Sequence, residues 1–158
     1  MNLIRRGIRF IKYNEHKSLT LLAWIYSAVF RLQILYMDTK RLKCRWGAEG
    51  EESPKEADVP QYLYAKKVSY AVDQVCQKTK WESKCLVRAL TAQKLLRRKK
   101  IATTLYLGCG LDENGKMIAH AWLRCGKMYV TGGMEGIMQL WINSVQEDAE
   151  GSKPCCGR

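Results

Sequence analysis

Three short segments with strand periodicity, close together in the second half of the chain, constrain the fold most. Residues 101–111, IATTLYLGCGL, alternate apolar with small or polar side chains, as a strand does. DENG at 112–115 is a hairpin turn signal, and residues 116–125 form the returning strand. Gly126 allows another tight turn before a third strand at 127–131. The pattern predicts a three-stranded antiparallel meander.

The segments before this meander have helical periodicity instead. We predict helices over 18–37, with Ser18 as N-cap, over 61–79 and over 81–100, and one more helix at 134–145. In the first helix we expect one covered face, made of Leu22, Ile25, Tyr26, Val29, Gln33 and Tyr36. Helices followed by an antiparallel sheet indicate the α+β class.

Composition divides the chain into four parts. Residues 1–46 are a basic amphipathic helical extension, and 47–60, GAEGEESPKEADVP, are an acidic linker bounded by prolines. Residues 61–145 form the core domain, and 146–158 form a flexible tail. Hydrophobic residues make up 47% of the 158 residues, which is enough for a real core and excludes a chain that is disordered throughout.

The net charge of +12 is uneven, since residues 1–45 carry ten Lys or Arg against two acids. Such a surface suits acidic peptides, anionic lipid or a protein partner, but nucleic acid is not expected, because no recognised motif accompanies the dispersed charge. A basic leader before apolar residues 18–37 also resembles a membrane anchor, although Arg31 and Gln33 interrupt the run. Two interpretations of residues 1–37 stay open, namely a packed helix and membrane contact.

Seven cysteines occur without a CxxC pair, and there are two histidines. No spacing matches a zinc site, so we predict no metal and no cofactor. An odd number of cysteines without a secretory signal indicates reduced thiols in the cytoplasm. For Cys76, Cys109 and Cys125 we expect small buried side chains.

Cys85 differs from the other cysteines by its place on the predicted helix 81–100. With Ser83 as N-cap, Cys85 lies in the first turn, where unpaired backbone N–H groups and the helix dipole stabilise a thiolate. Cys85 also begins a buried stripe with Ala89, Ala92 and Leu96. Taken alone, the helix position favours a Cys85 that is a packed core residue without a catalytic role.

His120 gives that thiol a partner. On the second strand it shares a face with Ile118, Trp122 and Arg124, and small residues on both sides let another element approach. A thiolate at a helix start and a histidine on a strand are the elements of papain-like catalysis. There imidazole removes the thiol proton and later protonates the leaving amine.

WESKCLVRALTAQKLLRRKKI, LYLGCG and AHAWLRCGKMYVTGG together resemble the lasso-peptide biosynthesis leader peptidases, over about residues 79–133. The resemblance implies a transglutaminase-like, papain-related fold with the nucleophile at a helix start packed on a small antiparallel sheet. It also implies a cysteine protease that removes the leader from a ribosomally made precursor peptide and passes the core to an ATP-dependent cyclase. From its length we expect the stand-alone protease half, which works with a separate leader-recognition protein.

Carried over by position, the resemblance makes Cys85 the nucleophile and His120 the base. Where the family places an orienting aspartate, this chain has Thr131, and the alternatives are Glu135 from the next loop or a backbone carbonyl. Residues expected to contact substrate are Trp81, Ser83 and Trp122, although the two tryptophans could simply pack. The backbone N–H of Cys85 is expected in the oxyanion hole.

Two alternatives to hydrolysis remain. The same fold can transfer the acyl group to an amine, because fold alone does not fix the reaction. The chain could also be a non-catalytic or membrane-associated interaction module with a degenerate site.

Overall fold

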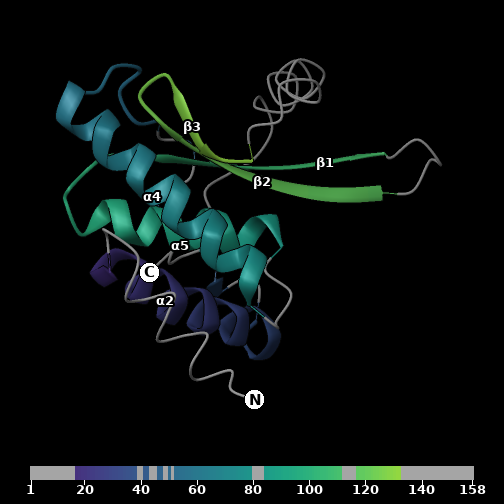
Figure 1. Cartoon of the computed structure of the whole chain (residues 1–158). Helices are drawn as coiled ribbons and strands as arrows, with labels where there is room; N and C mark the ends of the chain where they lie inside the picture. Colours follow the sequence, from purple (N-terminus) through teal and green to yellow (C-terminus); the bar gives the residue numbers. More distant parts are fainter. Residues whose placement is uncertain are drawn as a thin grey trace.

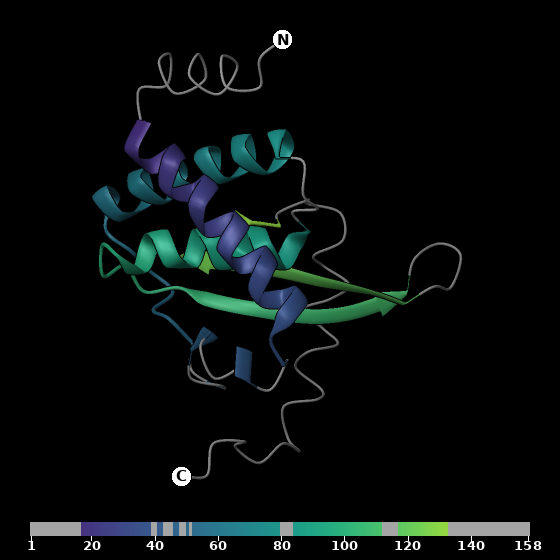
Figure 2. The same ribbon diagram turned by 90° about the horizontal axis from the view of Figure 1, so that it is seen from below.

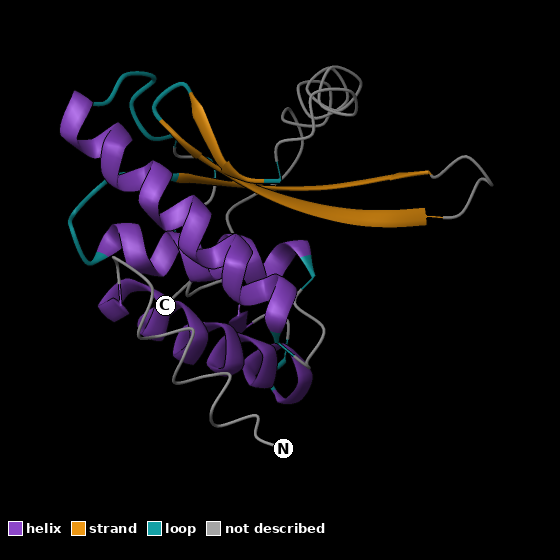
Figure 3. Cartoon of the chain, viewed as in Figure 1, coloured by secondary structure: helices purple, strands orange, loops and turns teal. Residues whose placement is uncertain are grey.

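The structure is a computed structural model that describes residues 17–38, 41–42, 46–47, 50, 52–79, 84–111 and 117–132. Within these ranges, three helices lie on one side of a three-stranded sheet (Figures 1 and 3). The predicted α+β class, with helices first and a small antiparallel sheet after them, is confirmed.

The sheet is the expected meander. Strands β1 (Thr104–Leu111), β2 (Met117–Cys125) and β3 (Met128–Thr131) pair antiparallel in the order β1-β2-β3. Gly126, with φ +56°, makes the turn between β2 and β3. The predicted DENG turn lies outside the described residues. Arg124 pairs with Tyr129 and Leu123 with Thr131, so the register shifts between Leu123 and Arg124 and Val130 is an extra residue in β3.

Three of the predicted helices are present, and the helix predicted at 134–145 lies outside the described residues. They are α2 (Lys17–Tyr36), α4 (Val59–Lys78) and α5 (Cys85–Arg97). Pro60 stands in the first turn of α4, where its missing N–H costs nothing. After α5, Lys100 takes a left-handed φ of 56° and the Ile101 N–H reaches back to the Leu96 carbonyl at 3.2 Å, which directs the chain into β1.

The core lies between the helices and the sheet. Buried side chains of α4 and α5 meet one face of β2 and β3, and Ser69 on α4 also donates to the Val130 carbonyl of β3 at 2.6 Å. Helix α2 packs on α4 and α5 and adds Leu19 and Ala23 to the same core.

The covered face of α2 differs in part from the prediction. Ile25, Val29 and Tyr36 were expected inside but are 41%, 39% and 83% exposed, whereas Ala23 and Ser27 are fully buried. The physical reason is that small side chains let two helices approach closely, so they form the contact while larger apolar residues turn outward. The predicted domain boundaries at 46/47, 60/61 and 145/146 stay predictions.

Candidate active site

Cys85 is the first residue of α5. We expected Ser83 as the N-cap, but Lys84 takes this position in an extended conformation, with no side-chain hydrogen bond to the helix. The first bond of the helix runs from the Arg88 N–H to the Lys84 carbonyl at 3.2 Å. The N–H groups that precede Arg88 in α5 therefore have no intrahelical acceptor, as is normal at a helix start. The Cys85 N–H is one of them, and it can serve a developing negative charge nearby.

The predicted stripe of α5 is confirmed. Ala89, Ala92 and Leu96 are fully buried, and the partly buried Cys85 packs against the same core. An ion pair of 3.1 Å between Arg88 and Asp73 joins this end of α5 to α4. The position of the Cys85 backbone is therefore set by core packing rather than by a helix cap.

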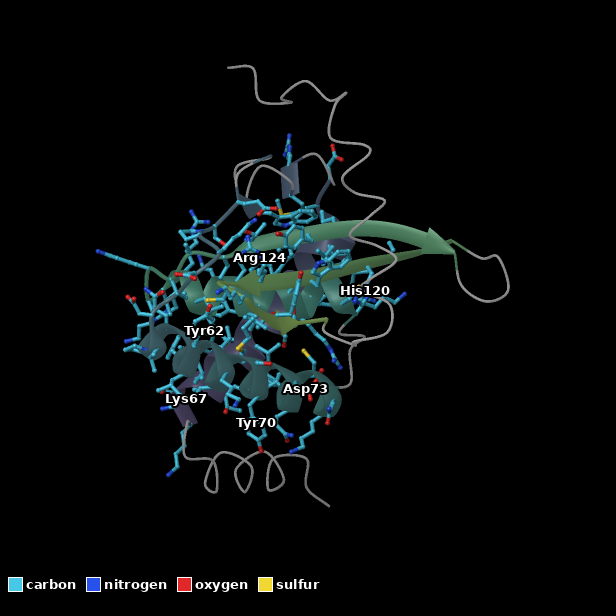
Figure 4. The ribbon with its side chains drawn as sticks, turned by 90° about the horizontal axis from the view of Figure 1, so that it is seen from above. Tyr62, Lys67, Tyr70, Asp73, His120 and Arg124 are labelled. Carbon is cyan, nitrogen blue, oxygen red and sulfur yellow. The ribbon has the colours of Figure 1, made fainter. Side chains whose placement is uncertain are left out.

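Strand β2 divides its side chains between two environments, as its alternation predicted. Ala121, Leu123 and Cys125 are buried in the core against the helices. His120 and Arg124 belong to the alternate set of side chains on the same strand (Figure 4). We refer to this second side as the outer face of β2.

Aromatic stacking holds the His120 imidazole on the outer face. Its ring lies 5.7 Å from the Trp122 ring at 29°, and Trp122 stacks on Tyr106 of β1 at 5.9 Å and 22°. Opposite His120 on β1 stands Gly108, which has no side chain to fill the space beside the imidazole. Trp122 is 5% exposed. This burial fits packing against His120, while its predicted contact with substrate stays a prediction.

The Cys85 thiol and the His120 imidazole both lie towards the edge of β2 that faces β3, just past the end of β3. The Cys85 Sγ donates to the Ala119 carbonyl at 3.7 Å. Carbonyls two residues apart point to the same side of a strand, and the Ala121 carbonyl faces Gly132, which follows β3. The Ala119 carbonyl, and with it the thiol, therefore lies at this same edge. A Cβ atom at position 132 would lie 3.2 Å from His120 Nε2, so the imidazole also reaches this edge.

Gly132 is a site residue whose role the sequence did not reveal. Its φ is +80°, and a Cβ there would come within 2.7 Å of Trp122 Cβ and 3.0 Å of the Ala121 carbonyl. Both the backbone conformation and the contacts thus require glycine. The sequence signal is the GG pair at 132–133 after the third strand, which is typical of a turn with positive φ.

The residue that orients His120 stays a prediction. The Thr131 hydroxyl is buried and has no hydrogen-bond partner among the described residues, so no bond from Thr131 to His120 is seen there. Glu135, Trp81 and Ser83 lie outside the described residues.

A second cluster, around Arg124, supports the strand that carries His120. The guanidinium is nearly buried and makes five hydrogen bonds of 2.8–3.4 Å. The acceptors are the Tyr106 and Thr104 hydroxyls, the Ser53 and Gly126 carbonyls, and the Glu52 carboxylate. Through Tyr106, this cluster continues into the stack of Trp122 and His120. Glu52 and Ser53, which belong to the predicted linker 47–60, are thereby attached to the sheet.

Burial also distinguishes the described free thiols. Cys76 and Cys125 are buried, as expected, whereas Cys85 is only partly buried. Burial raises the pKa of the Cys125 thiol, and the neighbouring Arg124 charge opposes the shift. Of the three thiols, Cys85 is the one that an external electrophile can reach.

No group of three or more His, Cys, Asp or Glu side chains within the described ranges is placed to hold a metal ion. A shallow pocket lined in part by Asp58, Lys100 and Gly126 lies where β2 ends, at the opposite end of the strand from His120. We place the candidate site at Cys85 and His120, because chemistry depends on reactive groups rather than on pocket size.

Comparison with known proteins identifies the family of the chain. A family model described as the transglutaminase-like superfamily matches residues 22–140, which is 119 of the 158 residues and includes both Cys85 and His120. Comparisons with curated proteins and with solved structures find no match. Because the matched region covers three quarters of the chain, the protein belongs to the transglutaminase-like superfamily.

Proposed function

We propose that the chain is a cysteine peptidase that removes the leader from a ribosomally made lasso-peptide precursor. The observation that supports the proposal is that the Cys85 thiol lies 3.7 Å from the carbonyl of Ala119, the residue next to His120 in β2. The superfamily generally includes cysteine peptidases and transglutaminases, whose chemistry begins with such a thiol.

The proposed reaction is the one that a thiol and an imidazole perform together. His120 removes the proton from Cys85, and the sulfur attacks the scissile carbonyl to form a tetrahedral intermediate. The Cys85 N–H, at the start of α5, stabilises the oxyanion. As the intermediate collapses, the imidazolium protonates the leaving amine. Water, deprotonated by His120, then hydrolyses the acyl-enzyme and restores the thiol.

The proposed substrate rests on the sequence motifs around these residues. CLVRAL at 85–90 and AHAWLRC at 119–125 resemble the lasso leader peptidases; the first segment begins α5, and the second lies in β2. We therefore propose a separate leader-recognition protein that delivers the precursor, and a cyclase that receives the freed core peptide.

The test combines the purified chain with a lasso precursor and its recognition protein and follows the products by mass spectrometry. We expect the wild-type chain to cut the precursor once, and both Cys85→Ala and His120→Ala to abolish the cut. Cys76→Ala, the control at a buried thiol, should still cut. Cutting that survives Cys85→Ala would contradict the mechanism. No cutting by the wild-type chain, with binding of precursor and recognition protein demonstrated, would favour an inactive module instead.

Acyl transfer is a second candidate, because the superfamily also includes transglutaminases. Adding a primary amine to the same reaction separates the two. Hydrolysis gives a product with a free carboxylate, whereas transfer gives an amide whose mass includes the amine.

A further inference from the structure

The outer side of α2 carries a continuous apolar stripe. Its members are 39–83% exposed and recur every three or four residues along the whole helix. They are Leu21, Trp24, Ile25, Val29, Leu32, Leu35 and Tyr36. We call this set the α2 stripe. A row of large apolar side chains in water is unusual for a soluble surface and indicates a partner that covers it.

The opposite side of α2 is already used inside the fold. Ala23 and Ser27 are fully buried against the other helices, and the Tyr26 hydroxyl accepts a hydrogen bond of 3.0 Å from Arg98 at the end of α5. Figure 2 shows α2 crossing in front of α4 and α5, so its outer side faces away from the rest of the fold. The helix therefore presents the α2 stripe while it stays part of the core.

Charge identifies the partner. No acidic residue lies in α2, and residues 1–45 carry ten Lys or Arg against two acids. An apolar stripe on a helix whose flanking sequence is basic matches a bilayer surface, which offers hydrocarbon beneath anionic headgroups. Trp24 and Tyr36 in the stripe are side chains that favour this boundary. We propose that the α2 stripe binds the surface of an anionic lipid bilayer.

The helix lies in the plane of the membrane rather than across it. By length and composition alone α2 could span a bilayer. Crossing would require its buried side to leave the core, or would carry exposed charges of α4 such as Lys66 and Lys67 into hydrocarbon. In-plane binding needs neither change, because the α2 stripe is already exposed.

This orientation leaves the candidate site in water. Helix α2 contacts α4 and α5, which in turn contact the sheet, so the outer face of β2 with His120 points away from the bilayer (Figure 1). A peptide could thus reach Cys85 and His120 while the chain is bound to the membrane. Membrane binding itself does not depend on the proposed peptidase activity.

The test is flotation of the full chain with vesicles of phosphatidylcholine, with and without phosphatidylglycerol. We expect binding to the anionic vesicles that weakens as salt rises and that Leu32→Glu lowers about tenfold or more. The matched control is Leu107→Glu on β1, an equally charged change at another exposed leucine, which should bind like the wild-type chain. Circular dichroism verifies that both variants are folded.

Five results would overturn the proposal. In the first, the chain does not bind anionic vesicles. In the second, both variants lose binding equally, and in the third, folded Leu32→Glu binds as well as the wild-type chain. The fourth is bound protein that resists an alkaline wash, because this would indicate a spanning helix. The fifth is a dimer, detected by sedimentation, that Leu32→Glu dissociates, because the partner of the α2 stripe would then be a second copy of the chain. Since none of these measurements uses catalysis, their outcome is independent of whether the chain cleaves a precursor.

Discussion

The two ends of β2 are held in different ways. At the Arg124 end, a nearly buried guanidinium makes five hydrogen bonds that join β1, the turn after β2 and residues 52–53. At the His120 end, the imidazole is held by a ring stack, and the thiol makes one long bond of 3.7 Å to a carbonyl. Among the described residues, the Arg124 end is therefore held by many hydrogen bonds, whereas the reactive groups at the other end are held by ring stacking and one long bond.

The largest expected effect separates catalysis from stability. His120→Ala should lower the rate of precursor cleavage about 10²–10⁴-fold, because it removes the general base. The free energy of unfolding should change little, since the ring is partly exposed rather than buried in the core. Cleavage assays and urea unfolding of the same sample measure both. A large loss of stability would show that this end of β2 is structural as well.

Arg124→Ala should show the reverse pattern. We expect a loss of about 2–4 kcal/mol in the free energy of unfolding, because buried hydrogen-bonding groups lose their partner. Urea unfolding of Arg124→Ala beside Arg124→Lys checks this, and lysine should recover part of the loss. An unchanged unfolding midpoint for the alanine variant would contradict the assigned role of the Arg124 cluster.

Two glycines allow a matched comparison of the two ends. Gly132→Ala and Gly126→Ala should each lower the free energy of unfolding by about 1–3 kcal/mol, because both positions have positive φ and a Cβ would meet close neighbours. At position 126 the neighbour is the Tyr62 hydroxyl, and at position 132 one neighbour is His120 Nε2. Folded Gly132→Ala should therefore also lose cleavage, while folded Gly126→Ala keeps it. Equal activities in the two variants would remove Gly132 from the site.

The smallest expected effect is a dependence of stability on alkaline pH that comes from the Arg124 end. Burial raises the pKa of Tyr106 above 10.0 and that of Cys125 above 9.0, so the unfolded chain ionises first. Stability from both groups is present below these values and is lost as pH rises through the folded pKa values. Urea unfolding between neutral pH and pH values above 10 checks the direction. Tyr106→Phe should weaken the dependence of the free energy of unfolding on pH. The same loss of stability with rising pH in Tyr106→Phe would contradict the contribution assigned to Tyr106.

Periodicity predicted the secondary structure well. The three strands, α4 and the buried stripe of α5 follow from local spacing, because each element buries one regular face. The covered side of α2 did not follow from spacing. Both sides of that helix are apolar, and the fit of Ala23 and Ser27 to neighbouring helices decided which one is buried.

The candidate site was predictable in its reactive residues but not in its supports. Cys85 and His120 stand in recognisable motifs, and their strand and helix positions could be derived from the sequence. The sequence placed Arg124 on the same strand face as His120 but did not reveal its hydrogen bonds, because its acceptors come from segments up to 72 residues away in the chain. The close approach of Gly132 to His120 likewise depends on where β3 ends, which is a matter of strand pairing.

The most direct test of the central claim compares the alkylation rates of individual cysteines in the wild-type chain and in His120→Ala. Brief iodoacetamide treatment near neutral pH, followed by peptide mass spectrometry, gives separate rates for Cys85, Cys76 and Cys125. We expect Cys85 to react fastest in the wild-type chain and to slow in His120→Ala, while the two buried thiols stay slow in both. If Cys85 reacted no faster than the buried thiols, or at the same rate without His120, the two residues would not form a nucleophile–base pair.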